Sequence, residues 1–443
     1  MNTTRVVFRC LLPLAILFTL ASSTVSAQQK MDSTNEDRVK LMLKKAYEEV
    51  KKNYYDPKIH GLDWDARYHE YEERVKKSNS LGQGLAQVAG LLDALNDSHT
   101  FFRPPSRPIL MEYGFRIQMI GDTPFITRIR PATDAESKLH PGDEVLLYNQ
   151  FAVNRAHLRQ MKYYYNALSP QGASKLALRD RNGQQREVVA DAKVRQLKRL
   201  MDLTAFGGGT DIWQLIREEQ RADELLRQRY VESGDVMICK MPEFFMPDEE
   251  VDHMFGIAKK HKALILDLRG NPGGLVTTLE RVVGNVCDHD VKIADRVGRK
   301  ELKPQLSKTR GTSAYSGKII VLVDSESASA AELFARVMQL EKRGTVIGDR
   351  TSGSVMESKG YSESLGMDTK IFYGFSITDA DLIMADGKSL EHVGVTPDEI
   401  VLPTAKDLAE GNDPPMARAA ALAGLTMDPA AAGKLFPFEW QPF

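Results

Sequence analysis

From about residue 235 onward, apolar segments typical of strands alternate with amphipathic segments typical of helices. The strand-like segments ALILDLR (residues 263–269) and KIIVLVD (318–324) are rich in Ile, Leu and Val. The helix-like segment AAELFARVMQL (330–340) directly follows the second of them. Because a helix that connects two parallel strands packs back onto their sheet, this alternation predicts an α/β core with a largely parallel sheet. We expect this core over residues 201–405.

Two regions of different character precede the core. Residues 36–97 carry apolar side chains near a period of 3.6, so we expect a small helical domain over residues 28–104. Short strand-like runs follow, separated by Gly-Asp and Pro-Gly turns, with one helix that Asn154 could cap and a final hairpin with an Asn-Gly turn. This pattern predicts a separate β-rich domain over residues 105–200. The chain is therefore expected to be a multidomain α/β protein.

The two ends of the chain and a segment near its middle have their own patterns. Residues 1–27 combine two arginines, a short apolar run and the small residues V-S-A, which is typical of a secretory signal peptide. We therefore expect export to the periplasm or out of the cell, with no membrane-spanning segment after the signal is removed. A charged helix is expected over residues 210–230. The Ala- and Pro-rich residues 406–443 are expected to form a peripheral tail.

The composition excludes several classes of function. The formal net charge is −1 at pH 7, so no basic excess favours nucleic acid or anionic lipid as a partner. Beyond the signal segment only Cys239 and Cys287 remain, which are compatible with one disulfide but form no disulfide framework. No Cys/His cluster has the spacing of zinc ligands, and we expect neither a metal nor another cofactor.

Two segments at predicted strand ends carry the candidate chemistry. DLRGNPGG (residues 267–274) could be a plain turn, but its glycines also allow backbone N–H groups to approach a bound group. VDSESASAAE (323–332) places serines where a strand meets a helix, either as helix caps or as an exposed nucleophile. A serine nucleophile needs a base, and the sequence offers Lys359 or the distant pair Ser98 and His99.

These two segments and DGKSLEHVGVTPDEIV (residues 386–401) resemble the catalytic domain of the C-terminal processing (tail-specific) serine peptidases and their tricorn relatives. The same superfamily includes interphotoreceptor retinoid-binding protein. The resemblance implies a crotonase/ClpP-like ββα core. The β-rich region resembles a PDZ domain, which implies binding of peptide ends. The residues implied to bind the peptide are Tyr113, Gly114, Phe115, Arg116 and Ile117.

The resemblance also implies roles for single residues. Ser329 corresponds to the nucleophile, and the N–H of Ala330 together with that of Gly273, or otherwise of Gly274, corresponds to the oxyanion hole. Ser354 stands where the Ser-Lys peptidases carry their lysine, so the base is expected from the tricorn pattern instead.

In that pattern Glu391 orients Ser98, Ser98 orients His99, and His99 takes the proton of Ser329. An ordinary histidine base predicts that activity rises with pH through a midpoint of about 6.5. The expected substrate is a peptide or an unfolded protein. Two alternatives stay open, namely a non-catalytic peptide- or lipid-binding protein and a Ser-Lys peptidase that uses Lys359. The sequence leaves open whether the protein forms an oligomer.

Overall fold

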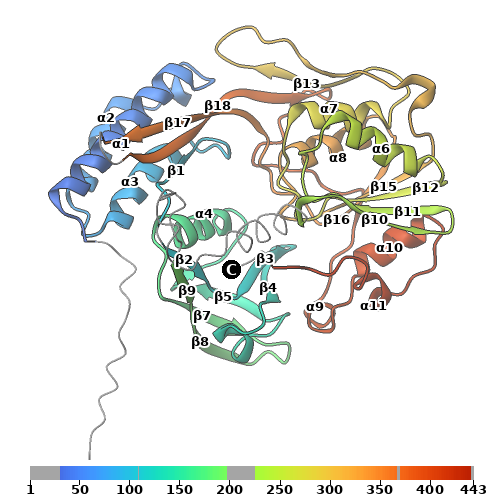
Figure 1. The fold of residues 1–443 in the computed structure, drawn as a ribbon, viewed down its shortest axis with the longest axis horizontal. Coiled ribbons are helices and arrows are strands. Elements are labelled where there is room, and N and C mark those ends of the chain that lie inside the picture. Colours follow the sequence, from blue (N-terminus) through green and yellow to red (C-terminus); the bar gives the residue numbers. More distant parts are fainter. Residues whose placement is uncertain (1–29, 108, 197–224, 367–369, 441–443) are drawn as a thin grey trace, which may run out of the picture.

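The computed structural model describes residues 30–107, 109–196, 225–366 and 370–440, which form a helical region, a β-rich middle domain and an α/β core (Figure 1). The expected signal peptide and most of the expected helix over residues 210–230 lie outside the described residues. The mixed α/β architecture that the sequence predicts is confirmed. Among the residues that the structure describes, no helix has both the length and the apolar character that crossing a membrane requires.

The helical region consists of α1 (Ser33–Asn53), the short η1 (Ile59–Gly61), α2 (Trp64–Lys76) and α3 (Leu81–Asp93). Side chains of Asp32, Asp63 and Ser80 accept hydrogen bonds from the first turns of α1, α2 and α3 and so fix where these helices begin. Strand β1 (Phe101–Arg103) follows α3 after a short turn. This turn, residues 96–100, carries Ser98 and His99.

The middle domain, residues 109–196, has its own hydrophobic core and a sheet ordered β3-β4-β5-β7-β8, in which β3 is an edge strand. Its helix begins at Leu158, whereas the sequence places the start near Asn154; the Asn154 side chain instead caps a turn by accepting the N–H of His157. The elements of this domain are β2 (Ile109–Glu112), β3 (Phe115–Ile120), β4 (Thr123–Ile129), η2 (Asp134–Ser137), β5 (Glu144–Tyr148), β6 (Phe151–Ala152), α4 (Leu158–Tyr163), η3 (Tyr164–Leu168), β7 (Ala173–Arg179), β8 (Gln185–Asp191) and β9 (Lys193–Gln196).

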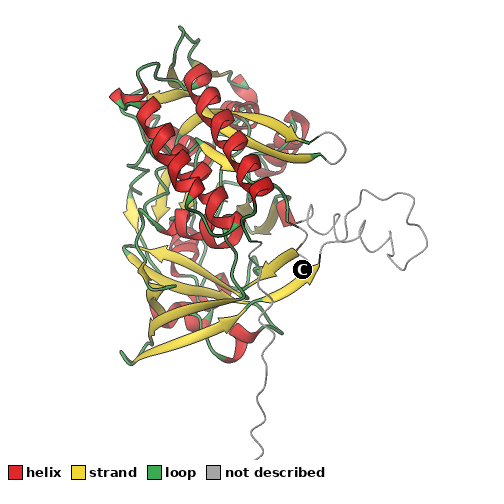
Figure 2. Ribbon diagram, turned by 90° about the vertical axis from the view of Figure 1, so that its left-hand side faces the viewer, coloured by secondary structure: helices red, strands yellow, loops and turns green. Residues whose placement is uncertain are grey.

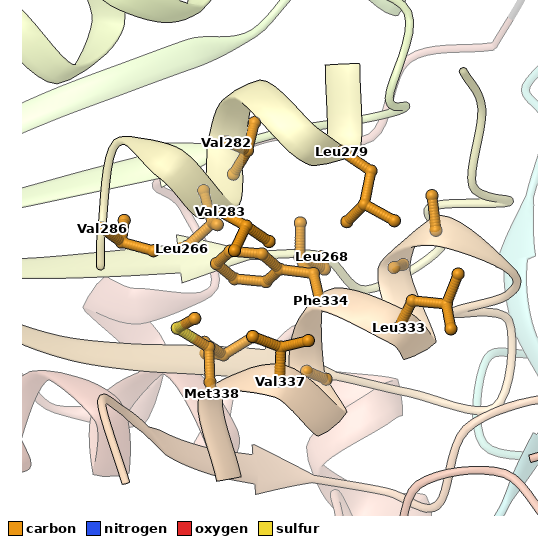
Figure 3. Close-up of a cluster of buried hydrophobic side chains, with 14 of the residues drawn as sticks. Leu266, Leu268, Leu279, Val282, Val283, Val286, Leu333, Phe334, Val337 and Met338 are labelled. Carbon is orange, nitrogen blue, oxygen red and sulfur yellow. The ribbon is translucent and has the colours of Figure 1, made fainter. Parts of the chain in front are cut away.

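The α/β core is built on a sheet ordered β10-β11-β12-β15-β16-β19, in which all neighbours except β10 and β11 run parallel. Helices α6, α7 and α8 cover one face, and Figure 3 shows Phe334 of α8 close to Val283 of α7 and Leu268, which follows β12. The bounds are β10 (Arg229–Ser233), β11 (Val236–Lys240), α6 (Asp248–Ala258), β12 (Ala263–Asp267), α7 (Val276–Gly284), β15 (Lys318–Val323), α8 (Ala330–Leu340), β16 (Thr345–Gly348) and β19 (Glu399–Ile400).

The opposite face of this sheet is covered by the end of the chain, which contains α9 (Ala405–Glu410), α10 (Pro414–Leu422) and α11 (Pro429–Ala432). The expectation of a peripheral tail over residues 406–443 is therefore wrong for α10 and α11, which contribute buried side chains to this core. Successive side chains of a strand point to opposite faces of the sheet. Met416, Ala419 and Ala420 are fully buried against the strand side chains that point to this second face, such as Ile238 and Ile265. Alanine permits this packing because its small side chain lets the helix approach the sheet closely.

A long hairpin joins the core to the helical region (Figure 1). Its strands β17 (Met356–Leu365) and β18 (Ile371–Met384) leave the core, and β18 pairs with both β1 and β13 (Val291–Val297), which also pairs with β14 (Gln305–Ser307). Tyr373, Phe375 and Ile377 of β18 complete the hydrophobic core of the three helices. Because β1 directly follows Ser98 and His99, this pairing fixes those two residues relative to the core.

Candidate active site

Ser329 lies between β15 and α8 with a backbone φ of 54° and ψ of −118°. A side chain other than glycine rarely adopts positive φ, and strained positions of this kind occur at functional sites. Two acceptors hold the Ser329 N–H, namely the carbonyl of Ser354 at 2.9 Å and Oε2 of Glu332 at 3.0 Å. Its side chain is partly exposed at the beginning of the helix, as an attacking hydroxyl requires.

The carboxylate of Glu332 connects the serine turn to the loop of residues 351–354. Besides Ser329 it accepts the hydroxyl of Thr351 at 2.6 Å and the N–H groups of Gly353 at 2.7 Å and Ser354 at 2.9 Å. Burial raises the pKa of Glu332 to about 7, although these hydrogen bonds oppose the shift. Glu332 therefore fixes the backbone of Ser329 relative to that of residues 353 and 354.

Three of the expected residues form a hydrogen-bonded chain. The Ser98 hydroxyl donates to Oε2 of Glu391 at 2.8 Å, and the same hydroxyl lies 2.8 Å from Nδ1 of His99. Because the Ser98 proton is directed to the carboxylate, Nδ1 must carry the proton of the second bond. Nε2 of His99 is then unprotonated and can accept a proton. Glu391 also receives the N–H groups of Ser98 and Val355, each at 2.7 Å.

His99 is neutral over most of the pH range. Burial and the positive charge of Arg159 lower the pKa of His99 to about 4, with Asp97 opposing the shift. The expected midpoint of about 6.5 assumed a solvated imidazole, and the buried ring beside Arg159 instead predicts a lower midpoint. Burial also raises the pKa of the Glu391 carboxyl, while its hydrogen bonds oppose that change.

A short segment lies between the nucleophile and the histidine chain. In the described part of the molecule no hydrogen bond joins the Ser329 hydroxyl to His99. The Ser354 carbonyl, however, accepts the Ser329 N–H, and the next residue, Val355, donates to Glu391. Arg159 of α4 donates to the Ser354 hydroxyl and to the Ser98 carbonyl, each at 2.8 Å. All four residues of the expected relay thus border one site.

The glycine segment contacts the nucleophile directly. A Cβ added to Gly273 would lie 2.6 Å from Cβ of Ser329 and 2.9 Å from the nitrogen of Ala330, so only glycine fits there. The Gly273 N–H already donates to Oδ1 of Asn271 at 2.8 Å. Within the described residues the N–H groups of Gly274 and Ala330 donate no hydrogen bond. Gly274 and Ala330 are therefore the available donors, whereas the Gly273 N–H, the first choice from the sequence, would have to leave Asn271 to serve.

The environment of Lys359 does not suit the role of a base for Ser329. It is on β17 with 65% of its side chain exposed, and its ammonium group pairs with Asp379 at 2.5 Å. This hydrogen-bonded pair raises the pKa of Lys359, whereas a lysine base needs a lowered one. The Ser-Lys alternative through Lys359 has no support in the structure.

The five residues expected to bind peptide have different environments. Tyr113 is buried, and its hydroxyl donates to the carbonyl of Tyr165. The Gly114 N–H donates to the Glu112 side chain at 2.8 Å. Phe115 and Ile117 face the core of the middle domain, while Arg116 extends to Glu326 at 2.8 Å.

Sequence reasoning missed three residues that support the site. They are Arg159, Asn271 and His392, the last of which the sequence motif sets aside in favour of its neighbour Glu391; its Nε2 lies 2.7 Å from the Asn96 carbonyl in the turn that carries Ser98. Arg159 and His392 contact residues 61 or more positions away in the chain, and nothing in the local sequence marks either contact. Asn271 could have been noticed, because it is the polar residue within the glycine segment.

Two family models match this chain. Residues 235–401 match Peptidase family S41, and residues 36–80 match the Tricorn protease C1 domain. The first match spans β11 to β19 and therefore contains Ser329, the glycine segment and Glu391. The second lies in the helical region, within α1 and α2 and the turn that precedes α3.

Individual relatives agree with these matches. A tail-specific protease of Haemophilus influenzae is 25% identical over 299 residues, covering 64% of this chain and 39% of the relative. A carboxy-terminal-processing protease of Bartonella bacilliformis is 30% identical over 146 residues, covering 32% and 31% of the two chains. The chain thus matches less than half the length of these curated relatives. The crystal structure of mature CPAF has the same fold, with a TM-score of 0.63 over 85% of this chain and 95% of that one at 16% identity.

Proposed function

Because the chain belongs to peptidase family S41 through its residues 235–401, we propose that it is a serine peptidase that cleaves peptide or unfolded-protein substrates. The observation that carries this proposal is the chain of hydrogen bonds from Glu391 through Ser98 to His99, which borders the strained Ser329. A nucleophile, a neutral base and an orienting carboxylate are the parts that acyl transfer by serine requires.

In the proposed reaction, Ser329 Oγ attacks the carbonyl carbon of the scissile bond and its proton moves to Nε2 of His99. The imidazolium is stabilised because Nδ1–H points to Ser98, whose hydroxyl points to Glu391. The N–H groups of Gly274 and Ala330 hold the negative oxygen. His99 then gives its proton to the leaving amine, and water hydrolyses the ester by the same steps in reverse order. The Ser329 hydroxyl must turn towards His99 when substrate binds.

Labelling with a fluorophosphonate tests this assignment, because the reagent reacts only with an activated serine. Mass spectrometry should locate the label on Ser329, and Ser329→Ala should remove it. Ser325→Ala is the matched control: its hydroxyl donates to the Met119 carbonyl, and its loss should leave the label in place. A label on another residue would contradict the assignment. No label and no cleavage would favour the non-catalytic binding alternative.

We also propose that the middle domain binds peptide ends, adding them as a strand beside β3. This strand is the edge of its sheet, and α4 supplies Lys162 on the other side. In the structure, Glu326 of the serine loop bonds both Arg116 of β3 at 2.8 Å and Lys162 at 2.7 Å. Burial opposes the shift, but these two cations lower the pKa of Glu326. These ion pairs support the proposal that a peptide carboxylate binds Arg116 and Lys162 in place of Glu326.

Peptide titration of the Ser329→Ala protein tests this second proposal. A peptide with a free C-terminus should bind more tightly than its amidated form, and Glu326→Gln should strengthen the binding of the free form by removing a competing carboxylate. Equal affinities for free and amidated peptides would exclude the carboxylate role.

A further inference from the structure

The end of the described chain lies against the middle domain. After α11 the described chain crosses from the core towards the sheet of β3 and β4 (Figure 1), and Figure 2 shows the molecule from a second side. The ring of Phe438 lies 5.3 Å from the guanidinium carbon of Arg116 and 5.7 Å from that of Arg128. Trp440 lies 5.7 Å from the guanidinium carbon of Arg130. Arginine over an aromatic ring is an attractive arrangement.

The same segment also contacts Arg229 of β10 in the α/β core. Phe436 lies 5.9 Å from the guanidinium carbon of Arg229, and the carboxylate of Glu439 lies 3.9 Å from the same arginine. The rings of Phe438 and Trp440 contact each other edge to face, with centroids 5.2 Å apart. Aromatic rings and a carboxylate thus meet arginines from two different regions of the protein.

A cavity of about 950 Å³ opens beside this segment. Its walls come from β3 and β4, from the ends of the core strands, and from the segment itself, so the segment does not fill the cleft. Carboxylates also line the cavity, among them Glu112, which pairs with Arg130, and Glu326, which pairs with Arg116. The guanidinium faces favour aromatic rings, and Arg229 offers a partner for a single carboxylate. Phe438 is 39% exposed, so its contacts are open to exchange.

We propose that this cleft is a second peptide-binding site, selective for segments that carry aromatic side chains next to a carboxylate, and that residues 438–440 are its built-in occupant. The site adjoins the groove beside β3, with which it shares Arg116 and Glu326, and Ser329 is not among its lining residues. Arg116 connects it to the serine loop, because its guanidinium contacts Phe438 and also bonds Glu326 of that loop. Exchange of the occupant therefore changes the contacts of that loop.

A truncated Ser329→Ala chain that ends at Pro437 tests the proposal. This truncation keeps Leu435 and Phe436, which pack against the core. A fluorescent, amidated peptide of residues 434–440, KLFPFEW, should bind the truncated chain at least about tenfold more tightly than the untruncated Ser329→Ala chain, whose own segment competes. A peptide with leucine at the positions of Phe438 and Trp440 keeps the apolar character but removes the rings, so it should bind at least about tenfold more weakly.

A second, full-length variant tests the same proposal in case the truncated chain does not fold. The full chain with Phe438→Leu and Trp440→Leu, again with Ser329→Ala, should gain binding of KLFPFEW. The proposal would be overturned if KLFPFEW bound the Ser329→Ala chain as tightly as it bound the truncated chain and the double-leucine chain. Equal affinity of the aromatic and leucine peptides would also overturn it. Binding to an inactive protein is measured throughout, so the result is independent of whether the chain is a peptidase.

Discussion

The hydroxyl of Ser98 lies between a carboxylate and an imidazole, and its two hydrogen bonds determine which nitrogen of His99 is free. A hydroxyl has a single proton, so donation to Glu391 obliges it to accept from Nδ1 of His99. Burial of the ring, together with the neighbouring positive charge of Arg159, lowers the pKa of His99 and so favours the neutral imidazole. Both effects prepare Nε2 as a base, and each leads to a separate prediction.

The pH dependence of kcat/KM should reflect the lowered pKa of His99. A base acts only when unprotonated, so activity should fall as pH decreases through about 4, well below 6.5. Arg159→Gln removes a positive charge and should move this midpoint upwards. The unfolded chain takes up the proton between pH 6.5 and 4 while the folded chain does not, so the fold loses stability over the same window. Circular dichroism at each pH separates the two effects, and an unchanged midpoint in Arg159→Gln would contradict the assignment.

Ser98 and Glu391 should behave as one unit. Each acts on Ser329 only by orienting His99, so Ser98→Ala and Glu391→Ala should lower kcat by similar factors. The double variant should be hardly slower than either single variant. Steady-state kinetics on a labelled unfolded protein measure this, and fully additive losses would show that the two residues act independently.

At the scale of elements, the start of α8 depends on a buried carboxylate. Glu332→Ala would leave the donors of Thr351, Gly353 and Ser354 without their acceptor, and the Ser329 N–H would keep only the Ser354 carbonyl. The unfolding free energy should fall by about 2–4 kcal/mol, since three buried donors lose their partner. Glu341→Ala, at the other end of the same helix, removes a pair with an exposed histidine and should cost less than about 1 kcal/mol. Denaturant titration compares the two, and equal losses would contradict the role given to Glu332.

The β17–β18 hairpin should contribute to the stability of the helical region. Phe375 is fully buried among the three helices, so Phe375→Ala should lower the unfolding free energy by about 3–5 kcal/mol. Phe372, three residues earlier on the same strand, is 61% exposed, and its replacement by alanine should change stability by about 0.5 kcal/mol or less. Denaturant unfolding of both variants checks this; a harmless Phe375→Ala would mean that the hairpin does not complete that core.

At the scale of the whole molecule, local patterns could predict the elements but not how distant segments meet. The apolar alternation after residue 235 predicted the strands and helices of the core, since each repeats a local period. The crossing of β18 into the helical region has no such pattern, because its partners β1 and α1 lie far away in the chain. Burial of α10 was missed because an Ala-rich segment has too weak an amphipathic pattern to distinguish a packed helix from a solvated one.

The candidate site shows the same limit. Ser98, His99, Glu391 and Ser329 could be proposed from motifs, and the structure brings the first three into contact. The choice between Gly273 and Gly274 could not be made, because it depends on the Asn271 side chain taking one N–H. Arg159 comes from the middle domain, and only the folded chain places it beside Ser98 and Ser354.

The central claim is that His99, and not a lysine, activates Ser329, and the cleavage rate of matched variants on fluorescently labelled casein tests it most directly. His99→Ala should lower kcat by at least about 10³-fold, as losses of a catalytic base do. Lys359→Ala should stay within about twofold of the unmodified protein, because that side chain is exposed and paired with Asp379. Full activity in His99→Ala together with loss of activity in Lys359→Ala would contradict the account.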